Sequence, residues 1–346
     1  MHAKEQRSAL WHVLLVATAV QSEAEQTHRQ QMHRDFGVLR NRDEQERGQG
    51  CVYTCGGKAS DDVEVADARC TRKHLQWRSG PQCRYPPSCS TLHADGANSD
   101  YLELMRRSLV GATALFSNVT LHQSSPPRGQ ARASGILINS GYLRMRNLQC
   151  LMQHVRDSGV PGDFVECGIW RGGAVLFMAS FVQAYNLSRT VWGFDSFMGV
   201  PSVSSGVRDV VNDRGWRDNN TDLAVSLAQV RSHMDKYNLK HRIRLVPGWF
   251  KDSIPTQQGT LARRGGIALL RIDGDLYSST MQVLTLLYPL VSLGGWVVLD
   301  DYSVPESRRA TTAYREAHGI TEPITFHTGS PFVYPVARWQ KTRTCC

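Results

Sequence analysis

Two apolar runs that each end in aspartates constrain the fold of this 346-residue chain most strongly. The first is Ile267-Ala-Leu-Leu-Arg-Ile-Asp-Gly-Asp, and the second is Gly294-Gly-Trp-Val-Val-Leu-Asp-Asp. Short aliphatic runs of this kind are typical of strands buried on both faces of a parallel sheet. Ligands bind at the carboxyl edge of such sheets, so we expect Asp273, Asp300 and Asp301 to meet there.

Strand and helix patterns alternate regularly around these two runs. The expected strands are Asp163–Ile169, Thr190–Phe197, Ile243–Val246, Ile267–Ile272 and Trp296–Leu299. The helical patterns between and after them are Ala174–Tyr185, Leu223–Tyr237, Thr280–Tyr288 and Glu306–His318. This order predicts an α/β fold with a doubly wound, mostly parallel sheet. An antiparallel C-terminal strand pair, Ile324–His327 with Phe332–Trp339, is expected to close it.

Composition divides the chain into three segments. Residues 1–24 contain the apolar run Ala9–Val20, which is too short to span a bilayer and predicts a signal peptide or an ordinary leader. Residues 25–98 are polar with few aliphatic clusters, which predicts a poorly ordered extension. Residues 99–346 carry the strand and helix patterns, beginning with a helix near Asp100. A secretory and a cytoplasmic location remain equally open.

Cysteines are concentrated in the polar extension, at Cys51, Cys55, Cys70, Cys83 and Cys89. In an oxidising compartment they could form disulfides, and in a reducing one they could hold zinc. No pair has the C-x₂-C spacing that would support a zinc site strongly. A third alternative is that they share no role.

Charge and hydropathy exclude some partners. The chain has 40 Lys and Arg against 31 Asp and Glu, but the basic residues are scattered and mostly lack interleaved aromatics. Nucleic-acid binding is therefore not expected. No apolar run predicts an integral membrane span. A homo-oligomer is compatible with the sequence, which does not determine the oligomeric state.

The three aspartates predict a metal site. Three carboxylates in one small volume repel one another unless a cation lies among them, and Mg²⁺ prefers oxygen ligands. The alternative for Asp300 and Asp301 is that they cap the helix after the strand. Asp275 is expected to be a turn residue or to lie behind the ligands, because alternation along an extended chain separates it from Asp273.

A glycine-rich turn follows the first strand, in Glu166-Cys-Gly-Ile-Trp-Arg-Gly-Gly. Glycines here let a ligand approach backbone N–H groups at a helix N-terminus. The spacing departs from the G-x-G-x-x-G of dinucleotide sites. Glu166 would repel a phosphate but attract the ammonium or sulfonium of S-adenosylmethionine, which disfavours an NAD-dependent oxidoreductase.

The next two strands end in further candidate donor-binding residues. Asp195, at the end of the second strand, is placed to accept hydrogen bonds from ribose hydroxyls. The third strand leads into Pro247-Gly-Trp-Phe, where Trp249 and Phe250 could form a wall against adenine. The alternative for both aromatics is ordinary core packing.

These motifs, in this order, resemble the macrocin O-methyltransferase (TylF-like) family. The matching runs are Val160-Pro-Gly-Asp-Phe-Val-Glu-Cys-Gly-Ile-Trp-Arg-Gly-Gly, Asp195-Ser-Phe-Met-Gly-Val-Pro, Leu223-Ala-Val-Ser, Val246-Pro-Gly-Trp-Phe-Lys-Asp, Asp273-Gly-Asp-Leu-Tyr-Ser-Ser-Thr and Gly294-Gly-Trp-Val-Val-Leu-Asp-Asp-Tyr. The resemblance implies that residues 99–346 form a methyltransferase domain that uses S-adenosylmethionine and Mg²⁺ to methylate a hydroxyl. The implied acceptor is a small molecule, often a sugar attached to a larger natural product.

The resemblance also assigns roles to positions. It implies that Asp273, Asp300 and Asp301 hold the metal. It implies a donor-binding role for Glu166, Gly168, Asp195, Ser196, Gly248, Trp249 and Phe250. Two departures fall in the donor motifs, since Cys167 replaces the usual threonine and Met198 the usual glutamate.

The chemistry requires an activated hydroxyl. Because an aliphatic hydroxyl has a very high pKa, coordination to a dication would help to deprotonate it, with Asp273 as the expected base.

The long segment from Ser202 to Asp222 is expected to be a lid. The alternative from another functional class is a degenerate methyltransferase fold that serves as a binding module.

Overall fold

The computed structural model describes residues 96–110, 136–138, 140–201, 223–327 and 336–344, together with three strands nearer the N-terminus. The chain divides into two units, Met1–Gly50 and Cys51–Cys346, and every described residue belongs to the second. The expected leader within 1–24 and the expected lid within 202–222 lie outside the described residues. The division at residues 24 and 98 therefore stays a prediction.

Three short strands occur in the polar extension. They are β1 Cys51–Cys55, β2 Lys58–Ala59 and β3 Leu75–Ser79, and they form an antiparallel sheet in the order β2-β1-β3. Two of the clustered cysteines, Cys51 and Cys55, are the end residues of β1. The other three cysteines of the extension lie outside the described residues.

The second sheet, as far as it is described, has seven strands and confirms the predicted fold class. They are β4 Asp163–Cys167, β5 Val191–Asp195, β6 Ile243–Pro247, β7 Ile267–Ile272, β8 Val291–Leu299, β9 Thr325–His327 and β10 Val336–Gln340. Their order is β6-β5-β4-β7-β8-β10-β9. The first five in this order are parallel, and β10 pairs antiparallel with both β8 and β9.

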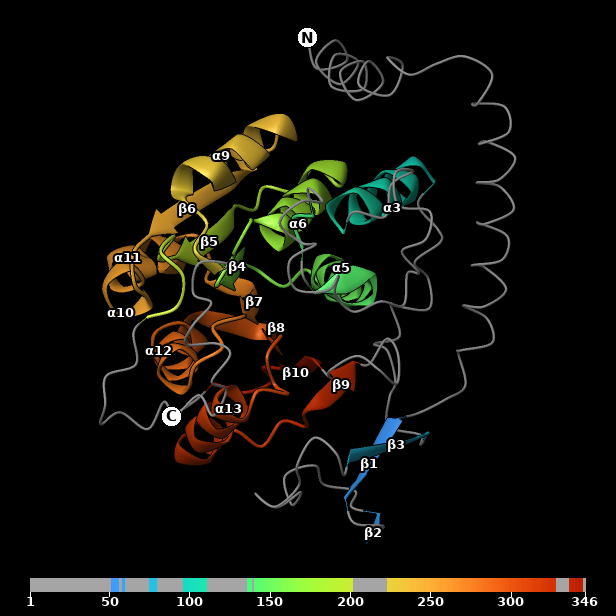
Figure 1. Cartoon of the computed structure of the whole chain (residues 1–346), viewed down its shortest axis with the longest axis vertical. Coiled ribbons are helices and arrows are strands. Elements are labelled where there is room, and N and C mark those ends of the chain that lie inside the picture. The colour runs from blue at the N-terminus through green and yellow to red at the C-terminus, as the bar shows by residue number, and fades with distance from the viewer. Residues whose placement is uncertain are drawn as a thin grey trace. The chain divides into compact units, whose positions relative to one another are not determined.

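Helices cover both faces of this sheet (Figure 1). On one face lie α3 Ala97–Leu109, α5 Gly141–Asp157, α6 Gly173–Ala184 and α9 Leu227–Lys236. On the other lie α10 Phe250–Ser253, α11 Pro255–Arg263, α12 Tyr277–Leu287 and α13 Pro305–Ala317. Two short 3₁₀ turns, Lys240–Arg242 and Tyr288–Leu290, lead into β6 and β8.

Successive side chains of a strand pack alternately into two hydrophobic cores, one on each face of the sheet. In β4, Phe164 packs into the core that includes α5 and α6, and its neighbour Val165 packs into the core that includes α12. Successive side chains of a strand point to opposite faces, so a strand buried on both faces must be apolar throughout. The sheet is therefore doubly wound, as predicted.

Some boundaries differ from the sequence patterns. Helix α9 begins four residues later than predicted, because Ser226 caps it in a reciprocal pair with Gln229. Strand β8 begins at Val291 rather than Trp296, and its register shifts near Ile267 where β7 begins. The segment Phe250–Arg263 is helical, which the periodicity did not predict.

Hydrogen bonds extend the parallel ladder beyond the strand ends. The amide of Asp273 donates to Cys167 O at 2.9 Å, and that of Asp300 donates to Ile272 O at 3.0 Å. These bonds hold the loops after β4, β7 and β8 against one another. The carboxyl ends of the central strands therefore form one ordered edge.

Two buried cysteines lie in the α/β part of the chain. Cys150, within α5, is disulfide-bonded, whereas Cys167, at the end of β4, is free. Among the described helices, none combines the length and the apolar character that a membrane crossing needs.

Candidate active site

Three aspartates converge at the carboxyl edge of β7 and β8. One carboxylate oxygen from each of Asp273, Asp300 and Asp301 lies within 4.8 Å of the others. This happens because β7 and β8 are adjacent and parallel, so the residues that follow them share one edge. Neither Asp300 nor Asp301 caps α13, whose N-cap residue is Val304 with no side-chain cap. The predicted convergence is confirmed, and the helix-cap alternative is wrong.

A fourth carboxylate lies beside the three. The backbone N–H of Asp275, a residue with φ of +57°, donates to Asp301 Oδ2 at 3.1 Å. Burial, with Asp273 and Asp300 nearby, raises the pKa of Asp275 to about 8. Burial and the neighbouring carboxylates also raise the pKa of Asp301 well above its usual value. These crowded acids favour a cation among them.

Arg271 lies at the centre of the cluster. Its side chain is 3% exposed and forms ion pairs with Glu166, with Asp273 Oδ2 at 2.7 Å, and with Asp300 Oδ1 at 2.8 Å. The same guanidinium donates to Ser140 Oγ at 2.9 Å. Sequence reasoning missed this residue. The available signal was a charge inside an aliphatic strand, since a buried arginine is almost always paired.

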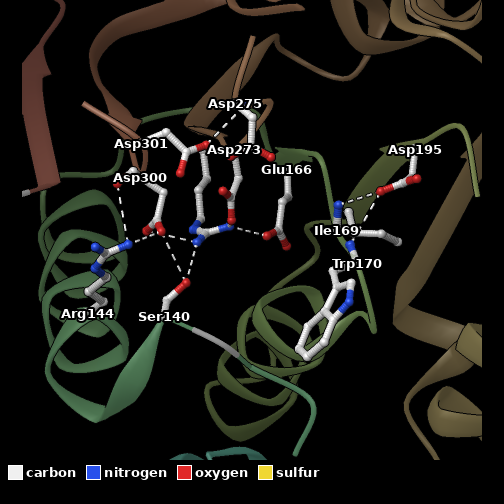
Figure 2. A network of polar contacts seen from close by, with 11 residues as sticks. Ser140, Arg144, Glu166, Ile169, Trp170, Asp195, Asp273, Asp275, Asp300 and Asp301 are labelled. Carbon is white, nitrogen blue, oxygen red and sulfur yellow. Dashed lines mark hydrogen bonds and ion pairs between the residues drawn. The ribbon is translucent and has the colours of Figure 1, made fainter. Parts of the chain in front are cut away.

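Helix α5 contributes two more groups that the sequence patterns did not single out. Ser140 Oγ donates to Asp300 Oδ2 at 3.1 Å, and Arg144 pairs with the same oxygen (Figure 2). Burial alone would raise the pKa of Asp300, but Arg144 and Arg271 outweigh it and hold the pKa below its usual value. The pKa values of the two adjacent aspartates are therefore shifted in opposite directions.

Glu166, the acid before the glycine turn, is 2% exposed and faces a cation that the chain itself supplies. One oxygen pairs with Arg271, and the other, Oε2, is buried without a hydrogen-bond partner. Burial raises the pKa of Glu166 to about 8 against the opposing effect of Arg271, and the charges of Asp273 and Asp300 add to the rise. This oxygen can accept a hydrogen bond from an N–H or O–H group of a bound molecule.

Asp195 organises the glycine-rich turn. Its Oδ2 accepts from the backbone N–H of Ile169 at 2.8 Å and of Trp170 at 3.3 Å (Figure 2). Its Oδ1 accepts from the backbone N–H of Phe197 at 2.7 Å. Burial raises the pKa of Asp195 despite these bonds. The carboxylate thus joins the turn after β4 to the turn after β5.

Ser196 closes the turn after β5. Its hydroxyl donates to Gly199 O at 2.7 Å and accepts from Met198 N at 3.0 Å. Met198 is 67% exposed in this turn. The hydroxyl predicted to hold the donor is therefore used within the chain, where it shapes the loop.

Gly168 allows β4 and β7 to approach at the edge. It has φ of +86°, and a Cβ there would lie 1.9 Å from the carbonyl oxygen of Asp273. Any side chain would displace the residue that carries the central carboxylate. The glycine is required for the close contact between the turn after β4 and the turn after β7.

Three non-glycine residues with left-handed backbone conformation lie at the same edge of the sheet. Trp170, Phe197 and Asp275 have φ of 47°, 57° and 57°, and they follow β4, β5 and β7 respectively. Non-glycine residues in this region are uncommon and cluster at functional sites. Three such residues on three neighbouring loops support this edge as the site.

The turn after β6 joins the same region. The N–H of Gly248 donates to Asp195 O at 2.9 Å. Phe250 is partly buried and packs against the core that includes α12. Core packing, the alternative to an adenine-binding role, is therefore observed for this residue. Trp249 is partly buried at the N-terminus of α10.

Comparison with known proteins places this site in a family. A model described as Macrocin-O-methyltransferase (TylF) matches residues 128–330, which is more than half of the chain. The chain belongs to the TylF family. The matched segment contains α5, the strands from β4 to β9, and all three converging aspartates.

Several similar proteins act on natural products. Demethyldecarbamoylnovobiocin O-methyltransferase of Streptomyces niveus is 38% identical over 269 residues, covering 72% of this chain and 97% of the relative. The 8-demethyl-8-(2,3-dimethoxy-alpha-L-rhamnosyl)-tetracenomycin-C 4'-O-methyltransferase of Streptomyces olivaceus is 42% identical over 186 residues, 53% of this chain and 69% of the relative. The structure of the O-methyltransferase NovP matches with a TM-score of 0.59 and 35% identity, over 71% of this chain and 100% of that one.

As a TylF protein, the chain is an S-adenosylmethionine-dependent O-methyltransferase. The resemblance seen in the motifs is confirmed. The alternatives of an NAD-dependent oxidoreductase and of a degenerate binding module are set aside.

Proposed function

We propose that this TylF protein transfers a methyl group from S-adenosylmethionine to a sugar hydroxyl of a glycosylated natural product, with Mg²⁺ at the three aspartates. The observation that carries the metal assignment is the approach of Asp273, Asp300 and Asp301 to within 4.8 Å. The acceptor class follows from relatives such as the Mycinamicin III 3''-O-methyltransferase of Micromonospora griseorubida, 42% identical over 189 residues.

The residues present fit a divalent ion. Arg271 and Arg144 already compensate Asp300, whereas Asp301 forms no ion pair with an arginine or lysine within the described residues. Asp273 pairs with Arg271 through Oδ2, so its Oδ1 is the oxygen that we assign to the metal ion. Mg²⁺ bound by these carboxylates would lower the pKa of a coordinated hydroxyl.

Asp273 is the proposed base. Its side chain is 28% exposed, against 4% for Asp300 and 2% for Glu166, so it is the most accessible of these acids to an acceptor. Arg271 holds this carboxylate in place through Oδ2, and the carboxylate can accept the hydroxyl proton. The hydroxyl oxygen then attacks the methyl carbon, and the carbon–sulfur bond breaks to leave a neutral thioether.

The donor would lie along the loops after β4, β5 and β6. In this proposal the unpartnered Oε2 of Glu166 binds the ammonium of the donor, and Gly168 lets its backbone approach. Asp195 accepts from the ribose while it keeps the turn closed. Ser196, Gly248, Trp249 and Phe250 complete the pocket, with Trp249 available to stack on adenine.

Replacement of Asp301 by asparagine tests the metal assignment. We expect methylation of a glycosylated acceptor to fall by about 100-fold, because the ion loses a charged ligand. Liquid chromatography with mass spectrometry would follow the product, which is heavier by one methylene group. The control is Asp235→Asn, at an exposed residue that pairs with Lys240 at the surface. If methylation by Asp301→Asn depends on Mg²⁺ concentration in the same way as methylation by the wild type, the metal assignment is wrong.

A further inference from the structure

Arg271 contacts both halves of the proposed site. One terminal nitrogen, Nη1, bonds Glu166 on the donor side and Asp273 Oδ2 on the metal side. The other, Nη2, bonds Ser140 Oγ and pairs with Asp300. Three carboxylates at the carboxyl ends of three different strands, β4, β7 and β8, therefore share one planar group. Figure 2 shows Glu166, Asp273 and Asp300 directed toward this shared centre.

We propose that Arg271 is a positioning residue that aligns the metal ligands and the donor-binding glutamate together. This inference rests on the proposed function and adds a residue to it. Each carboxylate gives one oxygen to Arg271, which sets the direction in which the other oxygen points. The planar guanidinium of Arg271 thus directs Asp273 Oδ1 toward the proposed metal ion. It directs Glu166 Oε2 toward the proposed binding site of S-adenosylmethionine.

The geometry requires a guanidinium. Arginine presents several donors in one rigid plane, whereas lysine offers a compact charge on a flexible stem. A lysine at residue 271 would keep the positive charge but could not hold all three carboxylates in fixed directions. Arg271→Lys therefore separates positioning from charge compensation.

Arg144 provides a matched control. It is also a partly buried arginine that pairs with Asp300, but it forms no ion pair with Glu166 or Asp273 in the described part of the chain. Arg144→Lys should disturb the metal side alone. The two charge-conserving variants therefore differ in whether the donor side is affected.

The experiment measures binding of two probes to the full-length protein without an acceptor. Mn²⁺ binding would be followed by electron paramagnetic resonance, and S-adenosylhomocysteine binding by isothermal titration calorimetry. For Arg271→Lys we expect the Kd of Mn²⁺ to rise by about 10- to 100-fold and that of S-adenosylhomocysteine by about tenfold. For Arg144→Lys we expect weaker Mn²⁺ binding, with the Kd of S-adenosylhomocysteine changed by less than about twofold.

The outcomes distinguish this inference from the proposed function. A wild-type protein that binds neither probe contradicts the proposed function. Wild-type affinities in a folded Arg271→Lys variant, or an equal loss of S-adenosylhomocysteine binding in both variants, overturn the positioning role. If Arg271→Lys does not fold, Ser140→Ala removes one contact of Arg271 together with the bond from Ser140 to Asp300. The positioning role then requires that the Kd of S-adenosylhomocysteine, and not only that of Mn²⁺, rises by about threefold. No change there also overturns the inference.

Discussion

Asp300 and Asp301 are adjacent in sequence, yet their carboxyl pKa values move in opposite directions. Burial acts on both, but Arg144 and Arg271 keep the pKa of Asp300 low, whereas neighbouring acids drive that of Asp301 up. Asp300 is thus a carboxylate whose charge two arginines of the chain already compensate. Asp301 is the acid that most needs a bound cation, which is why it is the residue to replace first.

Gly168 offers a second test at the scale of one residue. Gly168→Ala should lower the free energy of unfolding by about 3 kcal/mol, from left-handed backbone strain and from the clash with Asp273 O. Urea denaturation would measure the loss.

The matched control is Gly319→Ala. Gly319 has φ of +61°, but an added Cβ there meets no atom within 4 Å. It should cost only about 1 kcal/mol of strain. Equal losses in the two variants would show that the close approach of Gly168 to Asp273 is not important.

At the scale of elements, α5 links the site to the rest of the fold. Its start supplies Ser140 and Arg144 to Asp300. Two residues after Ser140, in the first turn of α5, Tyr142 donates to Glu103 of α3 at 2.5 Å. Glu103 also pairs with Arg106 and with Arg107, the latter at 2.6 Å. The position of α5 at the active edge therefore depends in part on a charged contact with α3.

This contact predicts a pH dependence of stability. Burial alone would raise the pKa of Glu103, but Arg106, Tyr142 and Arg107 hold it below its usual value. A carboxylate with a lowered folded-state pKa stabilises the fold above its unfolded value of about 4.3. That contribution is lost as the pH falls through the folded value.

Glu103→Gln should therefore be less stable than wild type by about 2 kcal/mol at neutral pH. The two proteins should converge in acid. Urea denaturation between neutral pH and pH values near the folded pKa would measure the difference. Glu316→Gln, on an exposed part of α13, is the control and should match wild type throughout. A difference for Glu103→Gln that does not change with pH would contradict the assignment.

At the scale of the whole molecule, the active edge opposes folding when no cation is bound. Asp273, Asp275, Asp300 and Asp301 lie together, and burial with repulsion from neighbouring carboxylates disfavours the charged forms of Asp275 and Asp301. The TylF fold holds them in place because the central strands are apolar on both faces and are packed between two helical layers.

Mg²⁺ should therefore stabilise the folded chain. At a concentration about 100 times the Kd, binding to the folded state alone adds about 2.7 kcal/mol. Thermal denaturation with and without a chelator would measure the shift in Tm, with NaCl at the same ionic strength as the control. The shift should be much smaller in Asp301→Asn. A Tm that does not respond to Mg²⁺ would contradict the metal site.

Much of the fold was predictable from the sequence because each local pattern has one good structural solution. The runs ending at Asp273 and Asp300 are too apolar for anything but buried strands, and parallel strands bring their carboxyl ends together. The approach of the three aspartates follows from that. The expected lid, in contrast, stays a prediction.

The sequence by itself determined the doubly wound sheet, the acidic edge and the family, because these depend on local periodicity and on short motifs. Only the tertiary structure decided that Arg271 joins Glu166 to Asp273 and Asp300, and that Arg144 and Ser140 reach Asp300 from α5. The physical reason is that the contacts of Arg271 with Glu166, and of Ser140 and Arg144 with Asp300, join residues more than a hundred positions apart in sequence. Their partners are set by how the helices and strands pack together, which local patterns do not encode.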